Sequence, residues 1–282
     1  MRKLLILFCI VFLYTGCNGS GQKEETYAPQ PNTVQEQNDE CTSKDYEPVE
    51  ITDSSNDDVT TMEPSSPSDS EQGTLSGKTI CIDPGHCVTT EKQYEQISPK
   101  SNETKNVFGG GTSGKNQTEE KLNLSVGLKL KDALKTEGAE VIMTREVSEI
   151  AINNIERAQI GNAADCCIRI HADGVDDSSV HGVSVLVPAG DLLGNPEIIE
   201  PSRTLGQLMV DCVSEQTGAK NRGIVNRSDL VGFNWSEVPS VLIEMGFMTN
   251  PEEDALLENE EYQQKIVQGI VQSIILWFTE TT

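Results

Sequence analysis

From residue 78 onward, short apolar runs of four to six residues alternate with longer stretches in which apolar residues recur at helical spacing. Buried strands of a parallel sheet appear in a sequence as such runs, and the connections that cross over between them are usually helices. The alternation therefore predicts an α/β fold. We expect a single domain with a central mixed, mostly parallel sheet flanked by helices.

The individual runs place the expected elements along the chain. The predicted strands are residues 79–82, 140–144, 166–170, 182–187 and 240–244. The predicted helices are residues 119–134, 152–164, 203–217 and 261–278. Between the first strand and the first helix we expect a long loop that includes the glycine-rich stretch 109–114.

Residues 18–76 have a different composition, dominated by Ser, Thr, Asn, Gln, Pro and acidic residues. Such a segment cannot bury enough apolar area to offset the entropy lost on ordering, so we expect a disordered linker. It contains 14 acidic residues against Lys23 and Lys44, and its net charge of −12 is half of the formal −24 of the chain. This acidity argues against nucleic acid as a partner, because phosphate binding needs clustered Lys and Arg.

Residues 1–17 have the pattern of an export signal. Arg2 and Lys3 precede an apolar run that is too short to span a bilayer comfortably. The run ends in LYTGC, which resembles a bacterial lipoprotein processing site, where cleavage before Cys17 frees its thiol for a lipid. Tyr14 stands where that pattern has an aliphatic residue, so a plainly cleaved secretory signal is the alternative. Either outcome predicts an extracytoplasmic protein, which contacts the membrane only through a lipid on Cys17 or is secreted.

Eight cysteines in an exported chain would ordinarily suggest disulfides. Only five lie after residue 77, and three of these stand inside apolar runs, where Cys acts as a small buried hydrophobe: Cys81, Cys166 and Cys167. We therefore predict mostly free thiols. Because no Cys pair has zinc-ribbon spacing, Cys is not the expected class of metal ligand.

Three residues stand at predicted strand or helix ends, where an open α/β sheet presents functional side chains: His86, Glu119 and His171. A Pro-Gly turn before His86 would bring its imidazole back over the sheet edge. Two imidazoles and one carboxylate are sufficient for a catalytic zinc ion, with the fourth position left for water. Taken alone, however, a single His is more often structural than a ligand.

Glu244 follows four residues that should be buried in the last predicted strand. A carboxylate in that position costs free energy unless it is paired or has a function, which makes Glu244 a candidate general base. The alternative is a strand-end Glu that points into solvent or pairs with Arg222.

Five separated motifs resemble the type 3 family of zinc-dependent N-acetylmuramoyl-L-alanine amidases, and they occur in the order of that family. They are DPGH at 83–86, Thr118-Glu119 leading into 122–124, Thr144-Arg145, IHAD at 170–173 and VLIEMGFMTN at 241–250. Together they cover essentially the whole chain after residue 78. The resemblance implies that residues 77–282 form an amidase catalytic domain of the α/β class.

The resemblance also implies the roles of the candidate residues. One catalytic zinc ion would be held by His86, Glu119 and His171, and Glu244 would be the catalytic acid and base. Glu119 is preferred over Glu120 because the metal-binding Glu of the family stands four residues before the Asn of an Asn-Leu pair. No other cofactor is expected.

A few residues near these motifs need separate interpretation. Cys87 stands where the family has Gly, and we expect it to pack beside His86, although ligand replacement is the alternative. Arg145 and Arg222 are expected to brace strand ends through ion pairs. We interpret His181 as a surface or packing residue.

The function implied by the resemblance is zinc-dependent hydrolysis of the amide between N-acetylmuramic acid and L-alanine in bacterial peptidoglycan. A zinc peptidase that trims stem peptides could use the same ligands. A third hypothesis is a wall-binding or regulatory protein with an amidase fold that does not turn over, its site occluded by residues 88–114 or 190–201. The sequence does not specify an oligomeric state.

Overall fold

The computed structural model describes residues 73–88, 94–107 and 111–281 of the 282-residue chain. The predicted export signal, with Cys17, and nearly all of the predicted linker lie outside these residues. Within the described ranges, no helix combines the length and the apolar character needed to cross a membrane.

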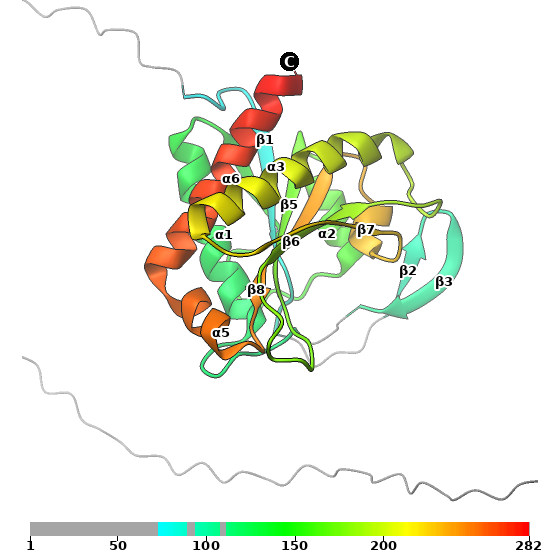
Figure 1. The fold of residues 1–282 in the computed structure, drawn as a ribbon. Helices are drawn as coiled ribbons and strands as arrows, with labels where there is room; N and C mark the ends of the chain where they lie inside the picture. The colour runs from blue at the N-terminus through cyan, green and yellow to red at the C-terminus, as the bar shows by residue number, and fades with distance from the viewer. Residues whose placement is uncertain (1–72, 89–93, 108–110, 282) are drawn as a thin grey trace, which may run out of the picture. The chain divides into compact units, whose positions relative to one another are not determined.

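Six strands form the central sheet in the order β4-β1-β5-β8-β6-β7 (Figure 1). Their bounds are Thr79–Pro84 for β1, Glu140–Met143 for β4, Cys166–Asp173 for β5, Val183–Pro188 for β6, Asn221–Arg227 for β7 and Ser240–Phe247 for β8. β4, β1, β5 and β8 run parallel, whereas β6 pairs antiparallel with β8 and parallel with β7. This arrangement confirms the mixed, mostly parallel sheet that the sequence predicts.

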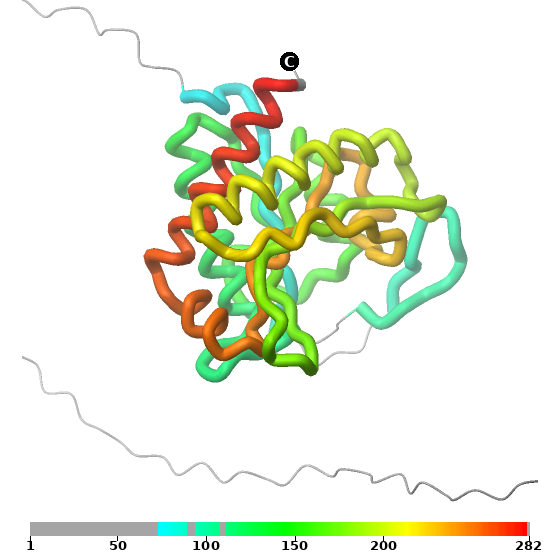
Figure 2. Tube along the Cα trace, viewed as in Figure 1, coloured from blue at the N-terminus to red at the C-terminus, as the bar shows by residue number. Residues whose placement is uncertain are grey.

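Three long helices pack on one face of the sheet, which we call the apolar face (Figure 2). They are α1 (Glu119–Thr136), α3 (Ile199–Thr217) and α6 (Glu260–Thr281). Every second side chain of the central strands enters this core, including Ile80, Ile82, Ile168, Ile170, Val241 and Ile243. One continuous cluster of buried apolar residues joins the helices to the strands, and it is the main core of the domain.

The opposite face, which we call the polar face, has a thinner cover. It consists of α2 (Asn154–Gly161), the short helix α4 (Val231–Asn234) and the hairpin of β2 (Tyr94–Ser98) and β3 (Ser101–Asn106). Among the described residues, apolar packing here is limited to two small clusters, one around Phe233 and Leu242 and one around Cys81 and Cys167. The alternate side chains of the central strands that point to this side are largely polar: Asp83, Arg169, His171 and Glu244.

Several elements differ from the sequence prediction. The β2–β3 hairpin lies within the segment expected to be a loop, and β7, α4, the 3-10 helix η1 (Pro196–Ile198) and α5 (Pro251–Glu258) were not predicted. The hairpin is held on the polar face by side chains near α4, because Trp235 Nε1 donates to the Gln96 carbonyl at 3.1 Å and Asn234 Nδ2 to the Ile97 carbonyl at 2.9 Å. The hairpin, residues 94–106, is therefore anchored beside α4.

Leu75 shows that the folded unit begins before residue 77, the predicted start of the domain. Its side chain is fully buried in the main core. Its backbone N–H also donates to the Glu137 carbonyl at 2.8 Å. One Leu in a polar stretch carries no periodic signal, so the sequence alone predicts a linker at this position.

Candidate metal centre

His86 follows β1 at the carboxyl edge of the sheet, and Gly85 is what allows its neighbour His171 to approach. The Gly85 N–H donates to the Ile170 carbonyl at 2.9 Å, which ties the turn to β5. A Cβ atom on Gly85 would lie 2.2 Å from the ring of His171, so only glycine fits here. The two imidazoles meet edge to face, with ring centroids 4.9 Å apart.

Glu119, the first residue of α1, lies between these two imidazoles. Its Oε1 atom is 3.1 Å from His86 Nε2 and 2.9 Å from His171 Nδ1. Further hydrogen bonds orient the buried carboxylate, from Asn123 Nδ2 and the Ala172 N–H to Oε1 and from the Thr112 N–H to Oε2. Burial alone would raise the pKa of Glu119, but hydrogen bonds with His171 and His86 outweigh it and hold the pKa well below its ordinary value.

Glu120 points elsewhere, as expected for adjacent positions of a helix. Its Oε2 atom accepts a hydrogen bond from Thr118 Oγ1 at 2.8 Å. Glu119 is therefore the acidic residue that the fold places with His86 and His171.

The three side chains fit a metal ion. One ligand atom from each of His86, Glu119 and His171 lies within 4.8 Å of the others, and no other group of this kind occurs among the residues that the structure describes. Tetrahedral zinc with bonds of about 2.0–2.1 Å would separate its ligand atoms by about 3.3 Å. The observed separations of 3.1 and 2.9 Å are close to that value. Two imidazole nitrogens and one carboxylate oxygen also match the donor set of a catalytic zinc site.

Glu244 belongs to the same cavity. It is the register partner of His171 on the neighbouring strand, and the cavity of about 320 Å³ is lined by Glu244 together with His86, Glu119 and His171. Its Oε2 atom is buried and has no hydrogen-bond partner. Burial, followed by the nearby charges of Glu119 and Asp173, raises the pKa of Glu244 well above its ordinary value.

The alternative interpretation of Glu244 does not hold. Arg222 instead lies over the ring of Phe247, at 5.1 Å from its centroid, and donates to the His181 carbonyl at 3.2 Å. Glu244 is therefore neither directed fully into solvent nor paired with Arg222. All four residues that the sequence singled out meet at one place.

A family comparison agrees with this geometry. Residues 80–275, more than half of the chain, match the family described as N-acetylmuramoyl-L-alanine amidase. The chain belongs to this amidase family. It is a hydrolase that cleaves the amide between N-acetylmuramic acid and L-alanine in peptidoglycan, and because peptidoglycan lies outside the cytoplasmic membrane, the amidase acts on the extracytoplasmic side.

Individual relatives support the assignment. The amidase is 29% identical over 209 residues to the N-acetylmuramoyl-L-alanine amidase Rv3717 of Mycobacterium tuberculosis. The matched region covers 71% of this chain and 86% of the relative. The solved structure of Ami1 from Mycobacterium smegmatis matches with a TM-score of 0.67 and 26% identity, over 73% of this chain and 99% of that one. An amidase structure from Clostridium difficile 630 matches with a TM-score of 0.59 and 26% identity, over 74% and 100%.

A second cavity of about 290 Å³ lies on the polar face and shares His86 and His171 with the first. Its wall includes Lys105 from the hairpin, Asn154 from α2 and Phe233 from α4. The two imidazoles thus stand between two cavities, one with Glu244 and one under the hairpin.

The cysteines and His181 agree with what the sequence predicts for them. The five cysteines of the described residues are all free, as predicted, and Cys87 is only partly buried and does not belong to the metal group. His181 is exposed and its Nδ1 atom lies 2.9 Å from the Ser179 carbonyl, in agreement with a surface role.

Arg145 behaves differently from the expectation. It is buried, yet among the described residues it has no ion pair. Its guanidinium donates to backbone carbonyls instead, including those of Pro84 and Gly85. Asn123 and Thr112, which orient Glu119, were also not identified from the sequence. Asn123 could have been found, because residues four apart on a helix share a face.

Proposed function

We propose that the amidase holds one catalytic zinc ion on His86, Glu119 and His171 and that Glu244 is its general base and acid. The observation that carries this proposal is the unpartnered, buried Oε2 atom of Glu244 in the cavity lined by all three ligands. A zinc ion bound here would lower the pKa of a coordinated water toward neutrality and polarise the scissile carbonyl.

Glu244 moves the proton during the reaction. Its Oε2 atom accepts the proton of the attacking water as the new bond to the carbonyl carbon forms. It then donates that proton to the L-alanine nitrogen as the carbon–nitrogen bond breaks, so the products are a carboxylic acid and an amine. Burial, which raises the pKa of Glu244, favours the protonated form that must act as the acid in the second step.

The substrate has a glycan on one side of the scissile bond and a peptide on the other. In this proposal, each of the two cavities that share His86 and His171 receives one of these sides. Asn123 and Thr112 keep the Glu119 carboxylate directed at the imidazoles, which preserves the ligand geometry when substrate enters.

Digestion of purified peptidoglycan tests this function. The mature chain without its lipid-bearing Cys17, residues 18–282, is loaded with zinc, and new amino groups are labelled and identified, with Glu244→Gln in parallel. We expect new N-terminal L-alanine from the wild type and a turnover about 10²–10⁴-fold lower for the variant, which should retain zinc. Full activity of Glu244→Gln would show that Glu244 is not the general base. A different new amine would indicate a peptidase.

We also propose that the amidase is a lipoprotein. In this proposal residues 1–17 are the signal, residues 18–76 are an acidic linker and residues 77–282 are the catalytic domain, with Cys17 carrying the lipid. The support is the LYTGC sequence after a short apolar run that follows Arg2 and Lys3. When expressed in a bacterial host, the wild type should partition into detergent and Cys17→Ser should not. Identical partitioning of both would favour a plainly cleaved secretory signal.

A further inference from the structure

The backbone of His86 is in an unusual conformation. Its φ angle is 60°, and it is the one residue other than glycine with a positive φ in the described part of the chain. The backbone of a residue with an L side chain rarely adopts this left-handed region. Such a conformation persists only where the surrounding contacts hold it. The direction of the imidazole depends on it, because a change of φ would swing the side chain away from Glu119.

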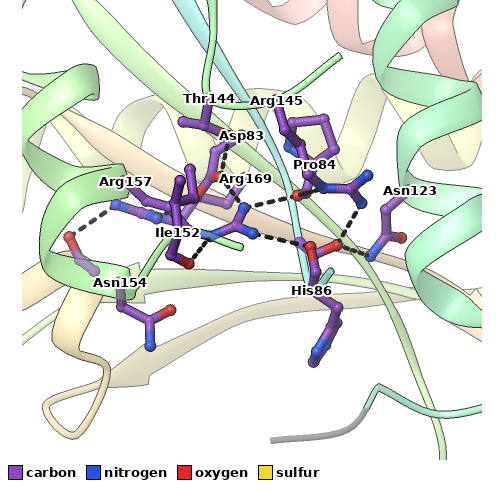
Figure 3. Close-up of polar contacts among 12 residues, drawn as sticks. Asp83, Pro84, His86, Asn123, Thr144, Arg145, Ile152, Asn154, Arg157 and Arg169 are labelled. Carbon is purple, nitrogen blue, oxygen red and sulfur yellow. Dashed lines mark hydrogen bonds and ion pairs between the residues drawn. The ribbon is translucent and has the colours of Figure 1, made fainter. Parts of the chain in front are cut away.

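Two buried guanidinium groups hold the carbonyls around this residue. Arg145 donates from Nε to the Pro84 carbonyl at 2.9 Å and from Nη2 to the Gly85 carbonyl at 2.8 Å. Arg157 donates from Nη1 to the Pro84 carbonyl at 2.8 Å and from Nη2 to the His86 carbonyl at 2.9 Å. Three consecutive carbonyls that end at His86 are thus all accepting from arginine, as Figure 3 shows.

The charges around these groups are unbalanced. Three buried arginines, Arg145, Arg157 and Arg169, lie within one network in which Asp83 forms the ion pairs (Figure 3). The charge of the buried Glu120 also acts on Arg145, so three cations face two carboxylates. Arg157 Nη1 lies 2.6 Å from Asp83 Oδ1, and Arg169 contacts the other oxygen. Buried cations are costly when they outnumber their carboxylate partners, and backbone carbonyls are the acceptors that remain for Arg145. The network therefore contains more arginines than are needed to neutralise Asp83.

We propose that Arg145 and Arg157 are positioning residues that clamp residues 84–86 in the conformation that carries the His86 imidazole to Glu119 and His171. The inference rests on the proposed role of His86 as a metal ligand. Its consequence is that the affinity of the site for zinc depends on two arginines that are not themselves metal ligands.

Arg169 provides a matched control. It forms the same kind of ion pair with Asp83, but its other hydrogen bond goes to the Gly232 carbonyl and none goes to residues 84–86. A lysine at any of the three positions keeps the charge but cannot bridge two acceptors as the planar guanidinium does. Loss of a bridging guanidinium elsewhere in the network and loss of the clamp can therefore be separated.

The experiment compares Arg157→Lys, Arg145→Lys and Arg169→Lys in the mature chain. The dissociation constant for Zn²⁺ is measured by competition with a chromophoric chelator, the visible spectrum is recorded with Co²⁺ in place of Zn²⁺, and melting of the metal-free protein is followed separately. We expect zinc affinity to fall about 10–100-fold in Arg157→Lys and Arg145→Lys, with an altered Co²⁺ spectrum. Arg169→Lys should keep a zinc affinity within about threefold of wild type, even if its melting temperature falls as much as those of the two clamp variants.

Two results would overturn the inference. Unchanged affinity in both clamp variants, with lowered melting temperatures, would make these arginines purely structural. An equal loss of affinity in Arg169→Lys would assign the effect to the charge network and not to the carbonyls. Because the two guanidinium groups hold overlapping sets of carbonyls, with that of Pro84 in common, the test does not depend on the folding of one variant.

His86→Ala separates this inference from the proposed ligand set. If His86→Ala binds Zn²⁺ as tightly as wild type, the proposed ligand set itself is wrong. If it loses Zn²⁺ while both clamp variants retain it, only the clamp is wrong.

Discussion

The two faces of the sheet are built from the same strands but are stabilised in different ways. On the apolar face, Ile80, Ile168 and Val241 join one continuous core beneath α1, α3 and α6. On the polar face, the alternate residues of the same strands include Asp83, Arg169 and Glu244. Asp83 and Arg169 form an ion pair and line one cavity, and Glu244 lines the other. Because successive side chains of a strand point to opposite faces, one set of strands supports a core and a reaction site without competition between them.

The comparison indicates where stability and activity can be separated. Apolar area stabilises the face under the long helices, whereas ion pairs and hydrogen bonds to carbonyls hold the face that carries the site. Substitutions on the first face should lower stability and leave the chemistry of the folded molecules unchanged. Substitutions on the second face should affect both.

The largest expected effect is that of Asp83→Asn. This change keeps the size of the side chain but leaves Arg157 and Arg169 without their carboxylate, so we expect the free energy of unfolding to fall by about 3–5 kcal/mol. Denaturant unfolding of the metal-free protein measures it. A loss below about 1 kcal/mol would mean that the polar face does not depend on its ion pairs.

A smaller effect is expected for Ile168→Ala on the apolar face. Ile168 is fully buried beneath the long helices, and the cavity left by truncation should lower the free energy of unfolding by about 2–4 kcal/mol. The turnover number per folded molecule, measured well below the melting temperature, should equal that of the wild type. A marked fall in turnover would show that the two faces are coupled.

The smallest expected effect is a difference in the pH dependence of stability. Burial alone would raise the pKa of Asp83, but Arg157 and Arg169 outweigh it and hold the pKa well below its ordinary value. A carboxyl with a lowered pKa in the folded state stabilises fully above its unfolded pKa of about 4, and this contribution is lost as the pH falls toward the folded pKa.

The wild type and Ile168→Ala should therefore lose stability in parallel below about pH 4, and Asp83→Asn should lose less over that range. Unfolding curves at a series of acidic pH values provide the measurement. Parallel curves for all three proteins would place the acid sensitivity in other carboxyl groups.

The sequence predicted the parts of the fold in which burial is strongest. Strands β1, β5 and β8 have apolar runs because they lie inside the sheet, and these runs carry a clear signal. β7 is an edge strand with the polar sequence NRGIVNR, so its pairing depends on β6 and leaves little trace in its own residues. Helix α5 could have been recognised from Asn250 and Pro251, which form a cap and a first turn.

The site was predictable to the extent that it depends on strand ends and on the family resemblance. His86, His171 and Glu244 follow apolar runs, whereas the choice of Glu119 needed the register of the family motif. The roles of Arg145 and Arg157 arise from contacts between residues 60 to 73 positions apart, which no local pattern encodes. For Arg145, the expected ion pair was wrong because backbone carbonyls serve as the acceptors.

The packing of Leu75 fixes the end of the domain at which the chain enters the fold. Residues 73–78 enter at the amino end of β1, and Lys78 Nζ lies 4.8 Å from the ring centroid of Phe278 near the end of α6. His86 lies at the other end of the same strand, about 20 Å away for six residues of extended chain. A segment that continues from residue 73 or from the end of α6 therefore leaves the domain at the end opposite the sheet edge that carries His86.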